Sequence, residues 1–560
     1  MEADWEGVMT ARGDLLLTAN AITARRPDPH APDPTWLTLF NRRFMSIAED
    51  MGRVLQNAAR SVNIRERLDF SCALFDRHGD LIANAPHIPV HLGSMGDSVR
   101  AILNRFGASM QSGDAYLINC PYAGGTHLPD ITVVMPVFGD DGPRYFTAAR
   151  AHHADVGGIS PGSMPADSTR IDQEGCRSEG LLILRDGLLY EAEVRDWLAG
   201  ILPSGRGAVG EGRHESDAMP AAARNPEQNV ADLTAQIAAC STGTRLLRQL
   251  EAEVGPAAVP AYMGFVQDNA ETAVKRLLCG LRDGEFALLL DDGSRIEVAV
   301  RVDRQALRAT IDFAGTSPQQ SGNLNAPACI AHSAALYVIR TLIDVDIPLN
   351  AGVLRPIGIR LPAGSLVNPC HPAAVVAGNV ETSQNIVDAL YGALGALAAS
   401  QGTMNNLSFG DDHHQYYETL CGGTGAGPGF DGASAVHSHM TNSRLTDPEI
   451  LELNFPVLLE RFEIRKGSGG RGRWHGGDGI LRRIRFLASM HGNLIALRRT
   501  TAPFGLNGGE PGQSGRQWLE KGIGGRKLLP GIASFEIDAG DVLLIETPGG
   551  GGFGSISQSG

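Results

Sequence analysis

The sequence predicts an α+β fold, a mixed architecture of several segments in which antiparallel hairpins are combined with packed helices. Three observations lead to this class. Apolar residues recur at three- and four-residue steps in long stretches, which is the period of an amphipathic helix. Short apolar runs flank turn-forming residues, which is typical of hairpins. The sequence contains no repeat of about 20 to 50 residues, which argues against a solenoid or a propeller.

Five stretches are predicted to be helices. The first, Thr35–Ala59, has the clearest pattern, because Phe40, Phe44 and Met51 fall with their apolar neighbours on one helical face. The others are Asn229–Val254, Tyr262–Arg282, Ala331–Leu342 and Ser383–Ala399.

Two antiparallel hairpins are predicted between the first and second of these helices. In the first hairpin, Phe70–Phe75 and Leu81–Ala83 flank a turn near His78. In the second, Ile131–Phe138 and Tyr145–His152 flank the turn sequence Gly-Asp-Asp-Gly-Pro. Further strand-like runs include Arg295–Phe313 and Ile480–Leu487.

The length of 560 residues predicts several domain-sized units. We expect an N-terminal extension (1–33), a metal-binding region (34–255), an α/β middle region (256–420) and a glycine-rich, β-containing C-terminal region (421–560). Many of the 69 glycines cluster in the last region between apolar segments. They are therefore expected to form ordered turns and close backbone approaches rather than flexible linkers.

The composition excludes several classes of protein. A net charge of -14 and a pI near 5.6 argue against nucleic acid as the main partner, because phosphates require a concentrated basic surface. No apolar run approaches the ~20 residues that span a bilayer. The acidic start, Met1–Asp14, lacks the regions of a signal peptide. The 8 cysteines form no CxxC pair, which indicates reduced thiols. These features predict a cytoplasmic protein.

The second hairpin brings together side chains that could hold a metal. With the turn centred on residues 140–141, Asp130 lies beside Ala151 and His152 at the open end of the hairpin. His127 precedes Asp130 in a glycine-containing loop and can turn back to the same point. Imidazole nitrogens with a carboxylate suit Zn, Mn or Fe. A satisfied core histidine or a surface His–Asp pair is the alternative, and the residues alone leave both interpretations open.

The first hairpin offers a further carboxylate. Its register sets Asp69 opposite His87 and Ile88, which makes Asp69 a candidate fourth ligand. His91 could line the same site or pack beneath it.

Two residues beside His152 are candidate catalytic residues. His153 and Asp155 could handle protons, although alternation along a strand directs His153 to the face opposite His152, where packing would be its role.

For four other histidines and one glycine-rich run, the sequence favours simpler interpretations than a second metal or an ATP site. We expect His413, His414, His437 and His439 to be solvated or hydrogen-bonded. The run Gly422–Gly427 lacks the Lys-Ser/Thr ending of a P-loop, so no ATP site is expected on this chain.

Several segments resemble family motifs over nearly the whole chain from about residue 34. Asn119–Asp130 resembles N-D-P-Y-x-G-G-T-H-L-P-D, and His152–Met164 resembles H-H-A-D-V-G-G…P-G-S-M. These motifs are characteristic of the hydantoinase B, 5-oxoprolinase and acetone carboxylase alpha-subunit superfamily, and the chain is similar to its N-methylhydantoinase B-like subunits. Further matching segments are Phe70–Leu74, His91–Met95, Gly315–Ser317, Asn379–Gln384, Gly422–Asp431, Ser468–Gly472 and Pro548–Gly554.

The resemblance implies a divalent metal ion, Zn, Mn or Fe, held by Asp69, His127, Asp130 and His152. The sequence departs from the family at Cys120, where the family usually has Asp. If that Asp orients a ligand, metal affinity or metal choice would differ in this chain.

The resemblance also implies a function. The chain would be the hydrolytic subunit of an ATP-dependent cyclic amidase. A hydantoinase A-like ATPase subunit would phosphorylate the amide oxygen, and this chain would deliver metal-activated water, within a hetero-oligomer. The alternatives are a subunit of an ATP-dependent ketone carboxylase and a non-catalytic scaffold for the ATPase. The residues leave open whether the substrate is a hydantoin, 5-oxoproline, another lactam or a ketone.

Overall fold

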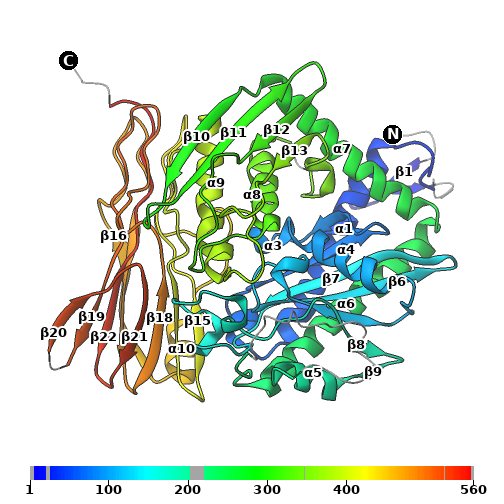
Figure 1. Cartoon of the computed structure of the whole chain (residues 1–560). Coiled ribbons are helices and arrows are strands. Elements are labelled where there is room, and N and C mark those ends of the chain that lie inside the picture. Colours follow the sequence, from blue (N-terminus) through cyan, green and yellow to red (C-terminus); the bar gives the residue numbers. More distant parts are fainter. Residues whose placement is uncertain (1–4, 20–25, 202–219, 346, 523, 557–560) are drawn as a thin grey trace.

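Five β-sheets and the helices packed on them make up the described parts of the chain (Figure 1). The structure is a computed structural model that describes residues 5–19, 26–201, 220–345, 347–522 and 524–556. The mixture of antiparallel sheets and packed helices confirms the α+β class predicted from the sequence. The N-terminal extension contains a small two-stranded hairpin, which the sequence pattern did not predict: β1 (Trp5–Met9) and β2 (Leu15–Ala19).

The N-terminal region is built on a seven-stranded antiparallel sheet of order β4-β3-β7-β6-β5-β8-β9. Both predicted hairpins lie side by side in it, because β3 pairs with β4 and also with β7. The strands are β3 (Phe70–Asp76), β4 (Leu81–Asn84), β5 (Ala115–Ile118), β6 (Asp130–Gly139), β7 (Gly142–His152), β8 (Leu181–Arg185) and β9 (Leu188–Leu189).

Helices cover both faces of this sheet. Successive side chains of a strand point to opposite faces, so Val133 joins the core beneath α1, α6 and α7, whereas Val134 joins the core beneath α4. The long helices confirm the predicted ones to within a few residues at their ends. They are α1 (Pro34–Ala58), α6 (Pro226–Val254) and α7 (Ala258–Gly280). The helix on the other face, α4 (Met95–Phe106), was not predicted from the sequence.

A second sheet and two buried helices form the middle of the molecule. The sheet β10-β11-β12-β13 is antiparallel except for its last pair, and it shares one hydrophobic core with α8 and α9. Its strands are β10 (Gly284–Leu289), β11 (Arg295–Asp303), β12 (Arg308–Asp312) and β13 (Ile357–Arg360). The helices are α8 (Ala328–Thr341) and α9 (Ser383–Leu394), which continues a π-helical turn over Gly378–Thr382.

The last part of the chain forms two further sheets that share a core (Figure 1, orange to red). One has the order β15-β14-β18-β21 and the other β16-β17-β22-β19-β20. Their strands are β14 (Asn406–Gly410), β15 (Gln415–Glu418), β16 (Val457–Arg465), β17 (Gly479–Phe486), β18 (Met490–Ile495), β19 (Arg516–Lys521), β20 (Gly525–Leu528), β21 (Ile532–Ile537) and β22 (Val542–Glu546).

The glycine clusters are ordered segments in which backbones approach one another closely. A Cβ atom on Gly423 would lie 1.9 Å from the carbonyl oxygen of Gly477, and one on Gly550 would lie 1.9 Å from that of Thr424. No side chain fits at such distances, so these positions require glycine. This confirms the expectation of close approaches in the glycine-rich region.

Two predicted elements differ in extent from the observed ones. The predicted helix Ser383–Ala399 ends at Leu394, because Gly395 adopts the left-handed conformation that terminates helices. The strand-like run Arg295–Phe313 forms two strands, β11 and β12, which pair across a turn.

None of the helices in the described residues is long and apolar enough to cross a membrane. The short helices are α2 (Val62–Arg65), α3 (Pro89–Leu92), α5 (Glu191–Leu198) and α10 (Pro448–Asn454).

Candidate metal centre

The β6–β7 hairpin places a carboxylate and an imidazole together at its open end. Asp130 and His152 are direct partners in the register, and Asp130 Oδ1 lies 3.2 Å from His152 Nδ1. This is the geometry predicted from the turn position.

The loop before β6 brings His127 to the same carboxylate. Gly124 turns the chain at a φ of 95°, and Gly125 packs against the backbone of Asn119. The backbone N–H of Asp130 then donates to the carbonyl of His127 at 3.1 Å. As a result, His127 Nε2 lies 3.0 Å from Asp130 Oδ1.

A third imidazole, that of His91 in α3, contacts the other oxygen of Asp130. His91 Nε2 lies 3.1 Å from Asp130 Oδ2, and its Nδ1 lies 3.2 Å from the hydroxyl of Ser71. Thr126 also donates to Asp130 Oδ2, at 2.7 Å. The sequence left the role of His91 open between lining the site and packing beneath it, and the structure places it against the carboxylate.

The cluster is almost completely removed from solvent, and this burial sets its electrostatics. Asp130 is 1% exposed and His152 is 2% exposed. Burial acts to raise the pKa of Asp130, but His127 and His91 outweigh it, so this pKa lies well below its usual range. Burial lowers the pKa of His152, and Asp130 partly offsets this effect. Asp130 is therefore an anion surrounded by imidazoles.

Unpartnered nitrogens indicate that these residues fit a metal ion. His127 Nδ1 and His152 Nε2 are buried, and none of the described residues hydrogen-bonds to either atom. One ligand atom from each of His127, Asp130 and His152 can be chosen so that all three lie within 4.8 Å of one another. Two imidazoles and a carboxylate are the donor set expected for Zn, Mn or Fe.

Asp69 reaches the cluster by a different route from the one predicted. The β3–β4 pairing stops at Asn84, so Asp69 does not pair with His87 or Ile88 as the turn position suggested. Instead, its carbonyl accepts the backbone N–H of His152 at 3.0 Å, in continuation of the β3–β7 pairing. The Asp69 carboxylate lines the cavity and lies 3.6 Å from Arg67, outside the group of three ligand atoms.

His153 and Asp155 are directed away from this cluster. His153 lies between two amides of α6: its Nε2 is 3.0 Å from Gln236 Oε1, and its Nδ1 is 3.1 Å from Asn229 Nδ2. Asp155 pairs with Arg224 at 2.9 Å and accepts backbone N–H groups of the following loop. Both residues have structural partners, and proton transfer by them stays a prediction.

The cluster opens onto a small cavity that residues distant in sequence complete. Its lining includes Tyr417, whose ring stacks on His152 with a centroid distance of 4.5 Å and an interplanar angle of 15°. It also includes Asn379, whose side-chain Nδ2 lies 3.5 Å from Asp130 Oδ2. The segment Asn379–Gln384 matches a family motif in the sequence, but the sequence alone predicts no role for Asn379. The other lining residues are Ile88, Val90, Val380, Met404, Thr419, Met440 and Thr441.

Cys120, the departure from the family pattern, is fully buried and is not among the residues that line the cavity. Its backbone carbonyl accepts the N–H groups of Ala123 and Gly125, so it supports the loop that carries His127. Burial raises the pKa of its thiol to about 12.

The remaining histidines considered from the sequence have separate surroundings. His414 contacts Asp411 at 3.0 Å, His439 contacts Asp388 at 2.9 Å, and His413 is exposed, as expected. His437 differs, because neither ring nitrogen hydrogen-bonds to any described residue, and burial lowers its pKa to about 4.

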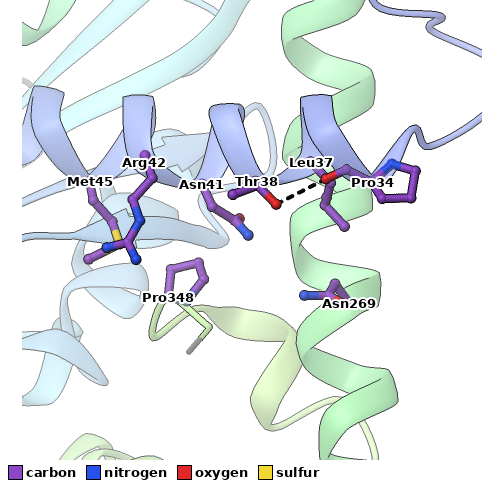
Figure 2. Close-up of a pocket in the computed structure, with 8 residues that line it drawn as sticks. All are labelled: Pro34, Leu37, Thr38, Asn41, Arg42, Met45, Asn269 and Pro348. Atoms are coloured by element: carbon purple, nitrogen blue, oxygen red, sulfur yellow. Dashed lines mark hydrogen bonds between the residues drawn. The ribbon is translucent and has the colours of Figure 1, made fainter. Parts of the chain in front are cut away.

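A larger pocket lies between α1, α7 and the loop that contains Pro348 (Figure 2). Thr38 donates a hydrogen bond to the carbonyl of Pro34 within α1. Asn269 lines the pocket from α7. Arg42 is the one charged residue among the described lining residues, which include no histidine and no acidic side chain. This pocket lacks metal-ligating groups, so we place the candidate chemistry in the buried cavity.

Comparisons with known proteins identify relatives of this chain and a solved structure with the same fold. "5-oxoprolinase 1" of Arabidopsis thaliana is 44% identical over 99% of this chain, which spans only 44% of that protein. A putative D-/L-hydantoinase subunit of Pseudomonas sp. (strain NS671) is 28% identical over 93% of this chain and 90% of its own length. The crystal structure of the ATP-dependent caprolactamase from Pseudomonas jessenii has the same fold, with a TM-score of 0.81, 24% identity and coverage of 94% and 92% of the two chains.

A family model matches almost the whole chain. It covers residues 33–556, which include every residue of the buried cluster. The chain belongs to the hydantoinase B/oxoprolinase family.

Proposed function

We propose that this chain is the hydrolytic component of an ATP-dependent enzyme that opens cyclic amides, such as 5-oxoproline or a hydantoin. One observation carries the proposal: in a member of this family, two histidines and an aspartate converge on a buried cavity, and each imidazole keeps a ring nitrogen to which no described residue hydrogen-bonds. The names of the relatives, a 5-oxoprolinase and a putative hydantoinase, support the cyclic-amide substrate class.

The residues that would hold a divalent cation are His127, Asp130 and His152, and we add Asp69 as the fourth ligand. A cation held there would act as a Lewis acid and ease the deprotonation of water. Neighbouring side chains hold these ligands in position. His91 and Thr126 fix the Asp130 carboxylate, while Tyr417 fixes the ring plane of His152. Burial excludes bulk water, which strengthens each electrostatic contact.

ATP would be used by a second, hydantoinase A-like subunit. The run Gly422–Gly427 is packed against other backbone segments; for example, a Cβ on Gly425 would lie 1.8 Å from the carbonyl of Ala398. It therefore offers no open loop for a phosphate chain. Because this chain spans less than half of the Arabidopsis relative, a separate ATPase is consistent with the comparison.

In the proposed reaction, the partner transfers a phosphoryl group from ATP to the amide oxygen. Water then adds to the activated carbon, and the carbon–nitrogen bond breaks as the nitrogen takes a proton. Hydrolysis of the resulting acyl phosphate releases phosphate and leaves an open-chain acid. The cavity of this chain is the site of the water addition.

Co-expression with the ATPase subunit tests this proposal. Substrate-dependent ADP release and ring-opened product are measured with 5-oxoproline, hydantoin and N-methylhydantoin. His127→Ala should abolish ring opening and leave ATP hydrolysis by the partner, whereas Asp140→Ala, at the exposed end of the same hairpin, should retain activity. Activity that depends on bicarbonate and a ketone would contradict hydrolysis and favour carboxylation. A metal-free preparation with full coupled activity would contradict the cation site.

A further inference from the structure

Strand β16 is an edge of the five-stranded C-terminal sheet, and in the described part of the chain no strand pairs with its outer side (Figure 1). Natural proteins usually protect such an edge, because its backbone N–H and C=O groups can pair with a further strand. Short length and proline are two common protections. β16 has neither, because it runs over nine residues and contains no proline. One irregularity in its pairing with β17, between Leu459 and Arg461, leaves the second half of the strand regular.

Side chains on both faces of this second half are exposed to solvent. Arg461 and Glu463 lie on one face, and Phe462 and Ile464 lie on the other. Phe462 is 47% exposed and Ile464 is 46% exposed. Four successive exposed residues show that the described chain covers neither face here. Two large apolar side chains are thereby left in water at the edge of the sheet.

The charges of β16 complement those of a second copy of the same strand. In an antiparallel pair about a two-fold axis, the residue on the axis faces itself, and residues equally far before and after it face each other. With Phe462 on the axis, Arg461 faces Glu463 of the second copy, and Glu463 faces Arg461. Opposite charges at facing positions stabilise a strand pair. An axis at Glu463 would set Arg461 against Arg465, and an axis at Ile464 would pair only the end of the strand.

Within one chain, Arg461 is poorly placed. It faces Arg483 in the register of β16 and β17, and like charges at facing positions repel. Arg483 contacts two carboxylates, those of Glu460 at 2.6 Å and Glu520 at 2.7 Å. The one ion pair of Arg461 among the described residues is with Glu463 of its own strand. A carboxylate from a second copy would therefore offset the repulsion between the two arginines.

We propose that β16 pairs with β16 of a second copy of this chain, about a two-fold axis at Phe462, and so joins two five-stranded sheets into one sheet across a homodimer. Arg461 and Glu463 of both copies alternate in sign on one face of this sheet, and the two Phe462 rings meet on the other. Strand pairing alone buries less than the roughly 1,200 Å² of a stable interface. The exposed side chains of Leu453 and Leu487, beside the start of β16, extend the contact.

The mass of the whole chain in solution, measured by sedimentation equilibrium over a range of protein concentrations, tests this proposal. Wild type should have twice the 59.3 kDa of one chain. Arg461→Glu sets two acidic residues against each other, and Glu463→Arg sets two basic ones, so each should weaken self-association at least about tenfold. Asp140→Arg is the matched control, because it reverses an exposed charge in a distant turn, and it should stay dimeric.

Mixing the two variants gives the sharpest result. One chain then carries Glu at both facing positions and the other carries Arg at both, so the mixture should form a mixed dimer although neither variant dimerises alone. The double variant, Arg461→Glu with Glu463→Arg, restores opposite charges and should dimerise like wild type. It thereby distinguishes a lost interface from a folding defect of a single variant.

A wild-type monomer at every concentration would overturn the proposal. A dimer that both charge reversals leave intact would also overturn it, as would two variants that stay monomeric when mixed. If wild type is monomeric but binds the ATPase subunit, and either reversal abolishes that binding, the outer side of β16 belongs to the ATPase and the homodimer is wrong.

Discussion

Asp130 Oδ1 lies 3.2 Å from His152 Nδ1, and the two residues face each other directly in the register of the β6–β7 hairpin. The contact joins the ends of two strands whose other ends meet in an exposed turn. Substitutions at different points of this hairpin can therefore distinguish effects on the site from effects on the stability of the sheet.

Asp130→Asn is expected to remove metal binding, because the amide lacks the negative charge that balances a divalent cation. Bound metal should fall from about one equivalent to near zero by elemental analysis. Asp140→Asn is the matched control in the exposed turn, where the side chain of Asp140 is fully accessible, and it should retain the metal. Equal metal content in both variants would show that Asp130 is not a ligand.

His152 and His153 are neighbours that face opposite sides of the sheet, so their alanine variants should fail differently. His152→Ala should lose metal and activity while it stays folded. His153→Ala should retain metal, but its free energy of unfolding should fall by about 2–4 kcal/mol, because the buried amides of Gln236 and Asn229 lose a partner.

A pH profile decides whether His153 also transfers protons. His153→Gln should have the activity profile of wild type if its role is packing. A shifted limb of the profile, with unchanged metal content, would support the catalytic role predicted from the sequence.

Asp69→Asn is expected to weaken metal binding about 10- to 100-fold without abolishing it, because Asp69 lies at the edge of the cluster rather than within it. Competition with a chelator of known affinity measures the change. Asp76→Asn, at the other end of β3, is the control. An unchanged affinity in Asp69→Asn would remove Asp69 from the ligand set.

Glu174 predicts a pH dependence of stability. Its carboxyl is fully buried and accepts the backbone N–H groups of Val375 and Val376, and burial raises its pKa from 4.5 to about 8. The folded state thus binds more protons than the unfolded state between these pH values, so stability is lost as pH rises through this window.

Glu174→Gln should remove this dependence, because the amide does not ionise. The slope of the unfolding free energy between about pH 5 and 8 should become flatter by up to ~1.4 kcal/mol per pH unit, the contribution of one proton. Denaturant melts at several pH values measure it. Identical slopes in both proteins would contradict a raised pKa for Glu174.

The parts of the site that depend on one hairpin could be predicted from the sequence, because a short turn fixes which residues face each other. Asp130 and His152 follow from the turn alone. The position of Asp69 does not, because it depends on which strand joins β3 on its other side, and this strand proved to be β7. A local pattern carries no information about such pairing.

The far wall of the cavity could not be predicted for the same reason. Asn379 and Thr441 are more than two hundred residues from His152 and reach it only through packing of the middle and last regions. The π-helical turn that directs Asn379 also has no signature in the apolar pattern of α9. The end of α9 at Gly395 carried a visible signal, a glycine within the helical period, which the predicted helix passed over.

We propose that His127, Asp130 and His152 together bind one divalent cation. Anomalous X-ray scattering from crystals of the whole chain grown with Zn²⁺ tests it most directly. We predict one strong peak about 2.0–2.2 Å from an imidazole nitrogen of each histidine and from an oxygen of Asp130. A crystal saturated with Zn²⁺ that shows its peak elsewhere, or no peak in this cavity, would show that these three residues do not bind the cation.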